Sequence, residues 1–374
     1  MAFIKKNFSV IFHHILFIMV HGNTCAVIEK NWSLNCPTTP YFLKQNASNF
    51  IMQKNNFIKK IPSHSCAKIE YFPSKLEKHW YANIDTIAGH EPHGCWNCGC
   101  AHIRASEKLI QQWLKVSSNR EKLLTQDVWS RDVFSYHKVS NLCRSGNRKR
   151  HAFKIPIEPL IGFLRHPLDF CFGHDKYERR GAFRLNKDYL IQRHAHEIVM
   201  HSKSFLFDLG ASTYSAGAGG ASQSWFIEQF MKRGIYFDRI FAWEATQMPD
   251  VEIFENVPKN VLNNLTYFNV PADPAFGAKH NPLRILAELV HEDDFVVFKM
   301  DIDTSSVEMP LIKQIMDDAA MHSRIDELYF EHHVSRSPMH WRGWGDTVGN
   351  ESLPDSYLLF SKLRSLGIRA HSWV

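Results

Sequence analysis

The chain has 374 residues, of which 44% are hydrophobic and 22% charged, and its formal net charge is +6. This length predicts about two domains, and the ordinary apolar and charged fractions exclude wholesale disorder, a collagen-like fibre and a multi-span membrane protein. Residues 1–200 hold 29 basic and 15 acidic side chains, a balance of +14, whereas residues 201–374 hold 15 and 23, a balance of −8. All eight cysteines lie at or before Cys171, so the two halves differ in chemistry.

The N-terminus has the pattern of a targeting segment. Lys5 and Lys6 precede a mostly apolar run, residues 8–20, which is shorter than the about 20 residues that a membrane span needs. A charged start followed by such a run predicts a secretory signal over residues 1–25, either cleaved or kept as a signal anchor, and a buried N-terminal helix is the alternative. Four glycosylation sequons agree with entry into the secretory pathway: Asn31, Asn46, Asn264 and Asn350.

Residues 26–153 form a basic region that contains most of the cysteines and is predicted to be mostly helical or irregular. The segment HGCWNCGCAH, residues 93–102, offers three thiols and two imidazoles that could ligate zinc. A zinc site usually shows a second paired cluster, and none is present, so disulfides of undetermined connectivity are the preferred interpretation. Ala101–Leu124 has the periodicity of a helix. The basic run at 144–151 is typical of a solvated loop, and nucleic acid is not an expected partner.

Residues 154–202 are predicted to connect the two halves. Ile155–Pro167 contains three prolines, which favour an extended segment, and Lys187–Met200 has a helical pattern that predicts a lead-in helix.

From residue 203 onward, short apolar runs alternate with helical patterns. The expected strands are Ser204–Gly210, Asp238–Glu244, Leu265–Val270, Phe295–Asp301 and Glu327–Glu331, and the expected helices are Ser222–Arg233, Leu283–His291 and Val307–Met321. Such alternation predicts an α/β fold with a doubly wound, mainly parallel sheet over residues 203–374. In such sheets, ligands bind outside the carboxyl ends of the strands.

The predicted strand ends carry residues suited to a nucleotide-like ligand. Glycines 217, 219 and 220 follow the first strand, and Glu244 ends the second, where an acid can accept both hydroxyls of a ribose. The G-x-G-x-x-G fingerprint is absent, which disfavours a plain NAD site.

The segments FLFDLGAS, IFAWEA, FVVFKMDIDTSSVE and ELYFEHH resemble the successive motifs of FkbM-type S-adenosylmethionine-dependent methyltransferases. The resemblance covers residues 203–374 and implies a Rossmann-like methyltransferase fold. Its most specific part is the block 299–308, and the stretch 363–371 is similar to the family's final hairpin entry. The chain departs from the pattern in an expanded loop, Ala211–Ala221, and in Asp303-Thr304, which replaces an acid-glycine pair.

The resemblance also implies roles for individual residues. Asp208 and Gly210 would line the methionine end of S-adenosylmethionine, and Glu244 would hold its ribose. Asp273 would face the adenine, and Asp301 would lie at the catalytic end. No metal is expected.

The reaction that this resemblance implies is methylation of a hydroxyl on a sugar, glycan or other small molecule. A hydroxyl acceptor requires a base, and His332 and His333 are the candidates closest to the predicted site, although a histidine beside a strand end is commonly structural.

Two alternatives stay open. One is a metal-dependent glycosyltransferase that uses Asp301-Ile302-Asp303 to bind Mn²⁺ or Mg²⁺, and the other is an inactive methyltransferase-like binding domain. The expected location is the lumen of the secretory pathway or outside the cell. Contact with a membrane is expected only through a signal anchor.

Overall fold

The computed structural model describes residues 67–118, 130–141, 152–169, 171, 186–198, 203–217, 220–341 and 344–373, together with the backbone of two N-terminal strands. The chain divides into two compact units, Met1–Lys59 and Lys60–Val374. In the first unit, β1 (Leu16–Val20) and β2 (Asn23–Val27) pair antiparallel. The expected signal segment otherwise lies outside the described residues, and over residues 16–20 the helical alternative is wrong. None of the described helices is long and apolar enough to cross a membrane.

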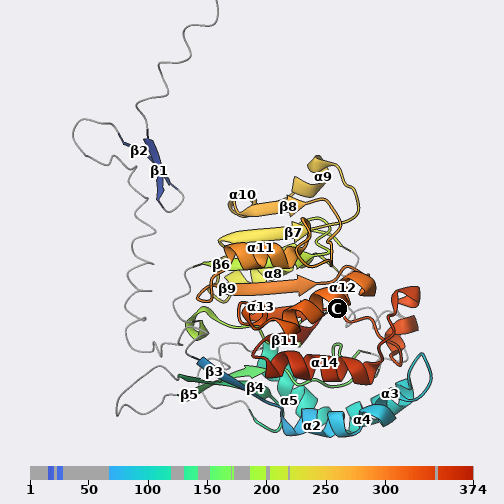
Figure 1. Ribbon diagram of the computed structural model, residues 1–374. Coiled ribbons are helices and arrows are strands. Elements are labelled where there is room, and N and C mark those ends of the chain that lie inside the picture. The colour runs from blue at the N-terminus through green and yellow to red at the C-terminus, as the bar shows by residue number, and fades with distance from the viewer. Residues whose placement is uncertain are drawn as a thin grey trace, which may run out of the picture. The chain divides into compact units, whose positions relative to one another are not determined.

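The centre of the second unit is a six-stranded sheet in which all neighbouring strands are parallel (Figure 1). Its strands are β6 (Ser204–Leu209), β7 (Arg239–Trp243), β8 (Leu265–Phe268), β9 (Phe295–Met300), β10 (Glu327–Phe330) and β11 (Arg369–Ser372). The spatial order is β11-β10-β9-β6-β7-β8. The prediction of a doubly wound parallel sheet is therefore confirmed. The final hairpin implied by the resemblance is wrong, because β11 runs parallel to β10 after a helical crossover.

The sheet is buried on both faces, which explains its continuous apolar strands. Every residue of β6 and β9 is buried. In the middle of the sheet the Phe207 ring lies 5.2 Å from that of Phe241 and 5.5 Å from that of Phe298, so aromatic side chains on three adjacent strands pack as one layer.

Helices cover the two faces of this sheet. Tyr329 and Phe330 are consecutive residues of β10 and therefore point to opposite faces. Tyr329 contacts Phe226 of α8 at 4.8 Å between ring centroids, and Phe330 contacts Phe360 of α14 at 6.3 Å, so these two helices lie on opposite sides. The helices of this half are α8 (Ser222–Met231), α9 (Asp250–Phe254), α10 (Lys259–Leu262), α11 (Pro282–Leu289), α12 (Ser305–Asp317), α13 (Ala319–His322) and α14 (Leu353–Ser365).

The described residues before 203 form a small antiparallel sheet and four helices. The sheet has the order β3 (Ala67–Phe72), β4 (Ser135–Asn141) and β5 (Ala152–Ile157). The helices are α2 (Lys75–Ala82), α3 (Ile84–Ala88), α4 (Trp96–Ala105) and α5 (Glu107–Ser118). This part belongs to the same compact unit as the parallel sheet.

Three local predictions for this part are corrected. The helix expected over Ala101–Leu124 breaks at Ser106, where α4 ends and α5 begins, and its last residues lie outside the described part. The connector Ile155–Pro167 is extended at its start, where it lies inside β5, an edge strand that tolerates Pro156, but it turns at residues 162–165.

The lead-in helix over Lys187–Met200 is absent from the described residues 186–194, and only a 3₁₀ turn, Ala195–Glu197, is present. Tertiary partners take the backbone groups that a helix would use. The amide of Ile191 donates to Glu158 Oε2, and that of Arg193 donates to Glu327 Oε1, both at 3.0 Å.

A buried network of charged side chains joins this part of the chain to the parallel sheet. Its members are Glu77 of α2, Glu158 after β5, Glu327 of β10, Arg364 of α14, and Arg369 and His371 of β11, all of them buried. Arg364 binds Glu77 at 3.3 Å and Glu158 at 3.1 Å. His371 binds Glu158 at 2.8 Å and Glu327 at 3.1 Å. Each buried charge therefore has a partner of opposite sign, as burial requires.

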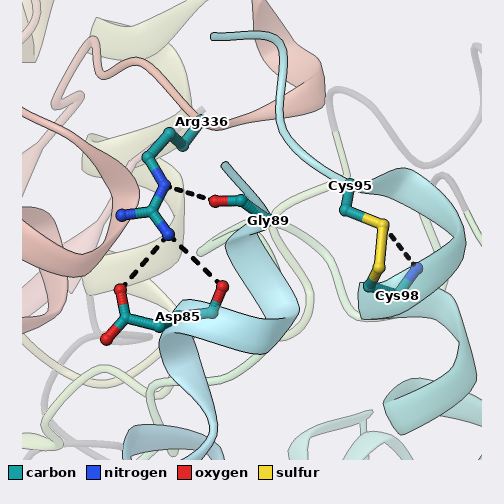
Figure 2. Close-up of a disulfide and its surroundings, with 5 residues drawn as sticks. All are labelled: Asp85, Gly89, Cys95, Cys98 and Arg336. Carbon is teal, nitrogen blue, oxygen red and sulfur yellow. Dashed lines mark hydrogen bonds and ion pairs between the residues drawn. A yellow bond between two sulfur atoms is a disulfide. The ribbon is translucent and has the colours of Figure 1, made fainter. Parts of the chain in front are cut away.

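Cysteines of the HGCWNCGCAH segment pair with cysteines, as the sequence predicts. Cys95 bonds to Cys98 at the start of α4, and Cys100 bonds to Cys171. Figure 2 shows Arg336, which follows β10, beside the first of these disulfides. Its guanidinium donates to the carbonyl of Gly89 and, at 3.2 Å, to Asp85 Oδ1. The segment after β10 is thus held against α3 and the disulfide-bearing turn.

Candidate functional site

The candidate site lies at the carboxyl ends of β6 and β9. From β6 the chain continues to β7 and β8 on one side and then returns to β9 on the other, and we call this place between β6 and β9 the switch point. Gly210 follows β6 with a φ of 77°, a conformation that favours glycine. A Cβ atom at this position would overlap the carbonyl oxygen of Asp301. The glycine therefore lets the ends of the two central strands approach each other. This close approach explains why a glycine occupies the position that the sequence predicts to lie at the site.

A buried lysine lies beneath this junction. Lys299 Nζ donates to the Gly210 carbonyl at 2.7 Å and lies 3.2 Å from Asp208 Oδ1 and 3.3 Å from Asp301 Oδ2. Burial lowers the pKa of Lys299, but the two carboxylates outweigh burial and raise it above its usual value. Asp208 is fully buried, and its other oxygen accepts from Ser222 Oγ at 3.0 Å. Asp208 thus supports the strand ends from below, and both of its oxygens face protein groups.

Asp301 forms a close carboxyl pair with Glu331, the residue after β10. Burial raises the pKa of Asp301 well above its usual value, and the adjacent Glu331 adds to this effect. Burial acts on Glu331 in the same sense, but Arg165 and His333 outweigh it and hold its pKa well below the usual range. The two groups therefore respond in opposite directions: Asp301 holds a proton more tightly than an ordinary aspartic acid does, and Glu331 holds one less tightly than an ordinary glutamic acid does.

Aromatic and cationic side chains fix this pair in place. Trp373 Nε1 donates to Asp301 Oδ2 at 3.1 Å, and Trp344 Nε1 donates to Glu331 Oε1 at 3.0 Å. Arg165 binds the same Glu331 oxygen at 2.6 Å. The second oxygen, Oε2, faces His333 at 3.4 Å.

His333 completes this end of the site. Its Nε2 lies 3.2 Å from Asp303 Oδ1 and 3.4 Å from Glu331 Oε2, and its Nδ1 lies 2.6 Å from Thr347 Oγ1. Burial lowers the pKa of His333, but the two carboxylates outweigh it and raise the pKa to about 9 when no cation lies between them. One ligand atom from each of Asp303, Glu331 and His333 lies within 4.8 Å of the others, so these residues could hold a metal.

His332 points away from this cluster. Its Nδ1 lies 3.0 Å from Ser356 Oγ of α14, and its ring stacks on Phe330 at 5.1 Å. Burial lowers its pKa to about 4. Of the two predicted base candidates, only His333 lies with Asp301 and Glu331, because consecutive residues after a strand face opposite sides.

Glu244 lies on the other side of the switch point, at the end of β7. Its Oε2 accepts from the Ser212 amide at 3.1 Å, and its Oε1 accepts from the Thr246 amide at 2.7 Å. The side chain is half-buried, so it borders both solvent and the glycine-bearing loop that starts after Gly210. A carboxylate has about four acceptor positions, so two remain for a ligand.

Asp273 lies farther along, in the loop after β8. It is half-buried, and its Oδ1 accepts from the Ala275 amide at 2.9 Å in a local turn. A separate open groove of about 550 Å³ lies between α11, α12 and α13, with Leu283, Pro310 and Met321 in its lining. None of the predicted site residues lines that groove.

Sequence reasoning missed Glu331, Arg165 and Trp373 as members of the site. Glu331 had a usable signal, because it directly follows a buried strand. Arg165 and Trp373 had none, since both reach the site through tertiary packing from distant segments.

Comparison of the chain with family models, with curated proteins and with solved structures finds no match.

Proposed function

We propose that residues 203–374 bind S-adenosylmethionine and that the protein methylates a hydroxyl group of a sugar or other small molecule. The observation that carries this proposal is the position of the Glu244 carboxylate. Two backbone amides fix its carboxylate at the end of the second strand, and its remaining acceptor positions suit the two hydroxyls of a ribose. Gly210 supports the proposal, because it brings the loop after β6 next to the end of β9.

The residues on the two sides of the switch point suit different tasks. On the side of β7 and β8, Glu244 and Asp273 offer acceptors for the ribose and the adenine. On the side of β9 and β10, Asp301 and Glu331 would face the acceptor; the lowered pKa of Glu331 makes it a weak base that suits accepting a hydrogen bond from the hydroxyl rather than removing its proton. Asp208 and Lys299 position the strand ends and do not contact the ligand in this scheme.

Calorimetric titration of the purified protein with S-adenosylmethionine tests the proposal. Loss of charge-assisted hydrogen bonds in Glu244→Ala is expected to remove roughly 1.5–3 kcal/mol, a ten- to hundredfold loss of affinity. Glu292→Ala removes an exposed acid elsewhere and serves as the matched control. Asp301→Asn is expected to leave cofactor affinity unchanged, because Asp301 lies at the reacting end.

The outcomes separate the alternatives. A glycosyltransferase would bind UDP-sugar with Mn²⁺ and lose that binding in Asp301→Asn, whereas an inactive domain would bind neither ligand. The contacts of the Asp-x-Asp segment do not favour a shared metal, because Asp301 faces Trp373 and Lys299 while Asp303 faces His333. A correctly folded wild-type protein that fails to bind S-adenosylmethionine would refute the proposed function.

We also propose that the protein resides in the secretory pathway or is secreted. Two disulfide pairs are compatible with an oxidising compartment. Among the described sequons, Asn350 is exposed, whereas the Asn264 amide group donates to the Phe237 carbonyl at 3.1 Å. Endoglycosidase treatment is expected to lower the mass of the native protein and to have a smaller effect, or none, on Asn350→Gln. A native protein that carries no glycan and only reduced thiols would contradict this location.

A further inference from the structure

We infer that Asp303, Glu331 and His333 bind one divalent transition-metal cation at the carboxyl ends of β9 and β10. The inference does not depend on the proposed methyl transfer. It rests on the direction of one buried imidazole nitrogen and on the spacing of three possible ligand atoms.

The hydrogen bonds of Thr347 fix the tautomer of His333. The Thr347 hydroxyl donates its proton to the carbonyl of Trp344 at 2.6 Å, so its oxygen is left as an acceptor for His333 Nδ1. The neutral imidazole therefore carries its proton on Nδ1 and its lone pair on Nε2. Fixing a ring through Nδ1–H in this way is the usual arrangement of a metal-binding histidine.

The Nε2 atom of His333 points at two carboxylates. The His333 side chain is only 2% exposed, and Nε2 makes no hydrogen bond of acceptable geometry, although Asp303 Oδ1 and Glu331 Oε2 lie 3.2 and 3.4 Å away. Two negatively charged carboxylates and one buried imidazole nitrogen thus converge on one point, and a cation bound between the three atoms would balance the two charges and give Nε2 a partner.

The spacing also fits a metal. With metal–ligand bonds of about 2.1 Å, neighbouring ligand atoms lie about 3.0 Å apart around an octahedral ion and about 3.4 Å apart around a tetrahedral one. The distances from His333 Nε2 to Asp303 Oδ1 and to Glu331 Oε2 fall close to these values, and the two carboxylate oxygens lie within 4.8 Å of each other. A set of two carboxylates and one imidazole suits Mn²⁺, Fe²⁺ or Zn²⁺ better than Mg²⁺.

The surroundings leave room for a further ligand. Glu331 uses its other oxygen for Arg165 and Trp344, so Oε2 is available to the cation. The Asp303 side chain is 63% exposed, so the cation would border solvent on that side. Its open positions would take an oxygen donor, which is water or, if the proposed function holds, the hydroxyl of the acceptor.

Titration of the EDTA-treated and dialysed full chain with Mn²⁺, followed by electron paramagnetic resonance, tests the site. We expect one Mn²⁺ per chain, with affinity at least about tenfold lower in Asp303→Asn. Asparagine tolerates the left-handed backbone that Asp303 adopts, with a φ of 54°, so this variant keeps the fold. Asp293→Asn, an exposed acid just before β9, is the matched control and should bind Mn²⁺ as the wild type does.

A pulsed measurement on the Mn²⁺-loaded protein supplies a direct signature. The wild type should show coupling to one imidazole nitrogen, and His333→Gln should lose that coupling. Absence of Mn²⁺ binding up to about 1 mM would overturn the inference and leave His333 as an imidazolium paired with two carboxylates. Binding that Asp303→Asn leaves unchanged, or binding without nitrogen coupling, would overturn it equally. Neither measurement involves S-adenosylmethionine, so failure here and failure of the proposed function are separate results.

Discussion

The two disulfides of the described residues are expected to differ sharply in their contribution to stability, because they close loops of very different length. Cys100–Cys171 spans a sequence separation of 71, whereas Cys95–Cys98 spans 3. In the chain-entropy treatment, a cross-link lowers the entropy of the unfolded chain by an amount that grows with the logarithm of the loop length. At 25 °C this gives about 4 kcal/mol for the long loop and about 2 kcal/mol for the short one.

Urea unfolding of three oxidised proteins measures this difference: the wild type, the double variant Cys100→Ala with Cys171→Ala, and the double variant Cys95→Ala with Cys98→Ala. The first double variant should lose about 4 kcal/mol of unfolding free energy, with a further loss for its two buried sulfur atoms, and the second about 2 kcal/mol. Equal losses, or a larger loss for the short loop, would refute the entropic reasoning and point to strain or residual unfolded structure as the dominant effect.

Three further predictions concern the site and the buried network. In urea unfolding, Gly210→Ala should destabilise the protein by about 1–3 kcal/mol more than Gly277→Ala does. Both glycines have a positive φ, but only at Gly210 would the added Cβ atom overlap another backbone atom. Lys299→Met should cost about 3–5 kcal/mol, since it leaves Asp208 buried without its cation, and adding Asp208→Asn should recover part of that loss. Burial raises the pKa of Glu327, but the guanidinium of Arg369 and His371 outweigh it and lower the pKa to about 2. The lowered pKa contributes about 3 kcal/mol to the free energy of unfolding. This contribution is fully present above about pH 4.3 and is lost as the pH falls towards about 2. Urea unfolding over that range should therefore show a shallower pH dependence for Glu327→Gln than for the wild type.

The parallel sheet could be predicted because its strands are buried on both faces and carry an unbroken apolar signal. The strands β6, β7, β9 and β10 lie where the apolar runs indicated. The helix expected over Lys187–Met200 could not be corrected from sequence, because its apolar spacing suits a helix equally well. What decides against it is tertiary: the backbone amides of Ile191 and Arg193 find carboxylates on distant segments.

The candidate site, too, could be predicted only in part. Glu244 and Asp301 follow strands, so their approach to the switch point was accessible from topology. The different positions of His332 and His333 were harder to predict. They depend on tertiary contacts, because His332 contacts Ser356 of α14 whereas His333 contacts Thr347. The carboxyl pair of Asp301 and Glu331 was accessible only in part: both residues follow buried strands, but their contact depends on β9 and β10 being neighbours in the sheet.

The buried charge network limits how this molecule can be divided or recombined. Expression of residues 203–374 alone would remove Glu77 and Glu158, the carboxylates that pair with Arg364, and would expose apolar side chains that form one core with the residues before 203. Such a fragment is expected to aggregate or to be degraded, however complete its parallel sheet. For the same reason, a chimera with a different N-terminal segment would need carboxylates at equivalent points. A substitution of Arg364 is therefore expected to need a compensating change at Glu77 and Glu158 in the first part of the compact unit.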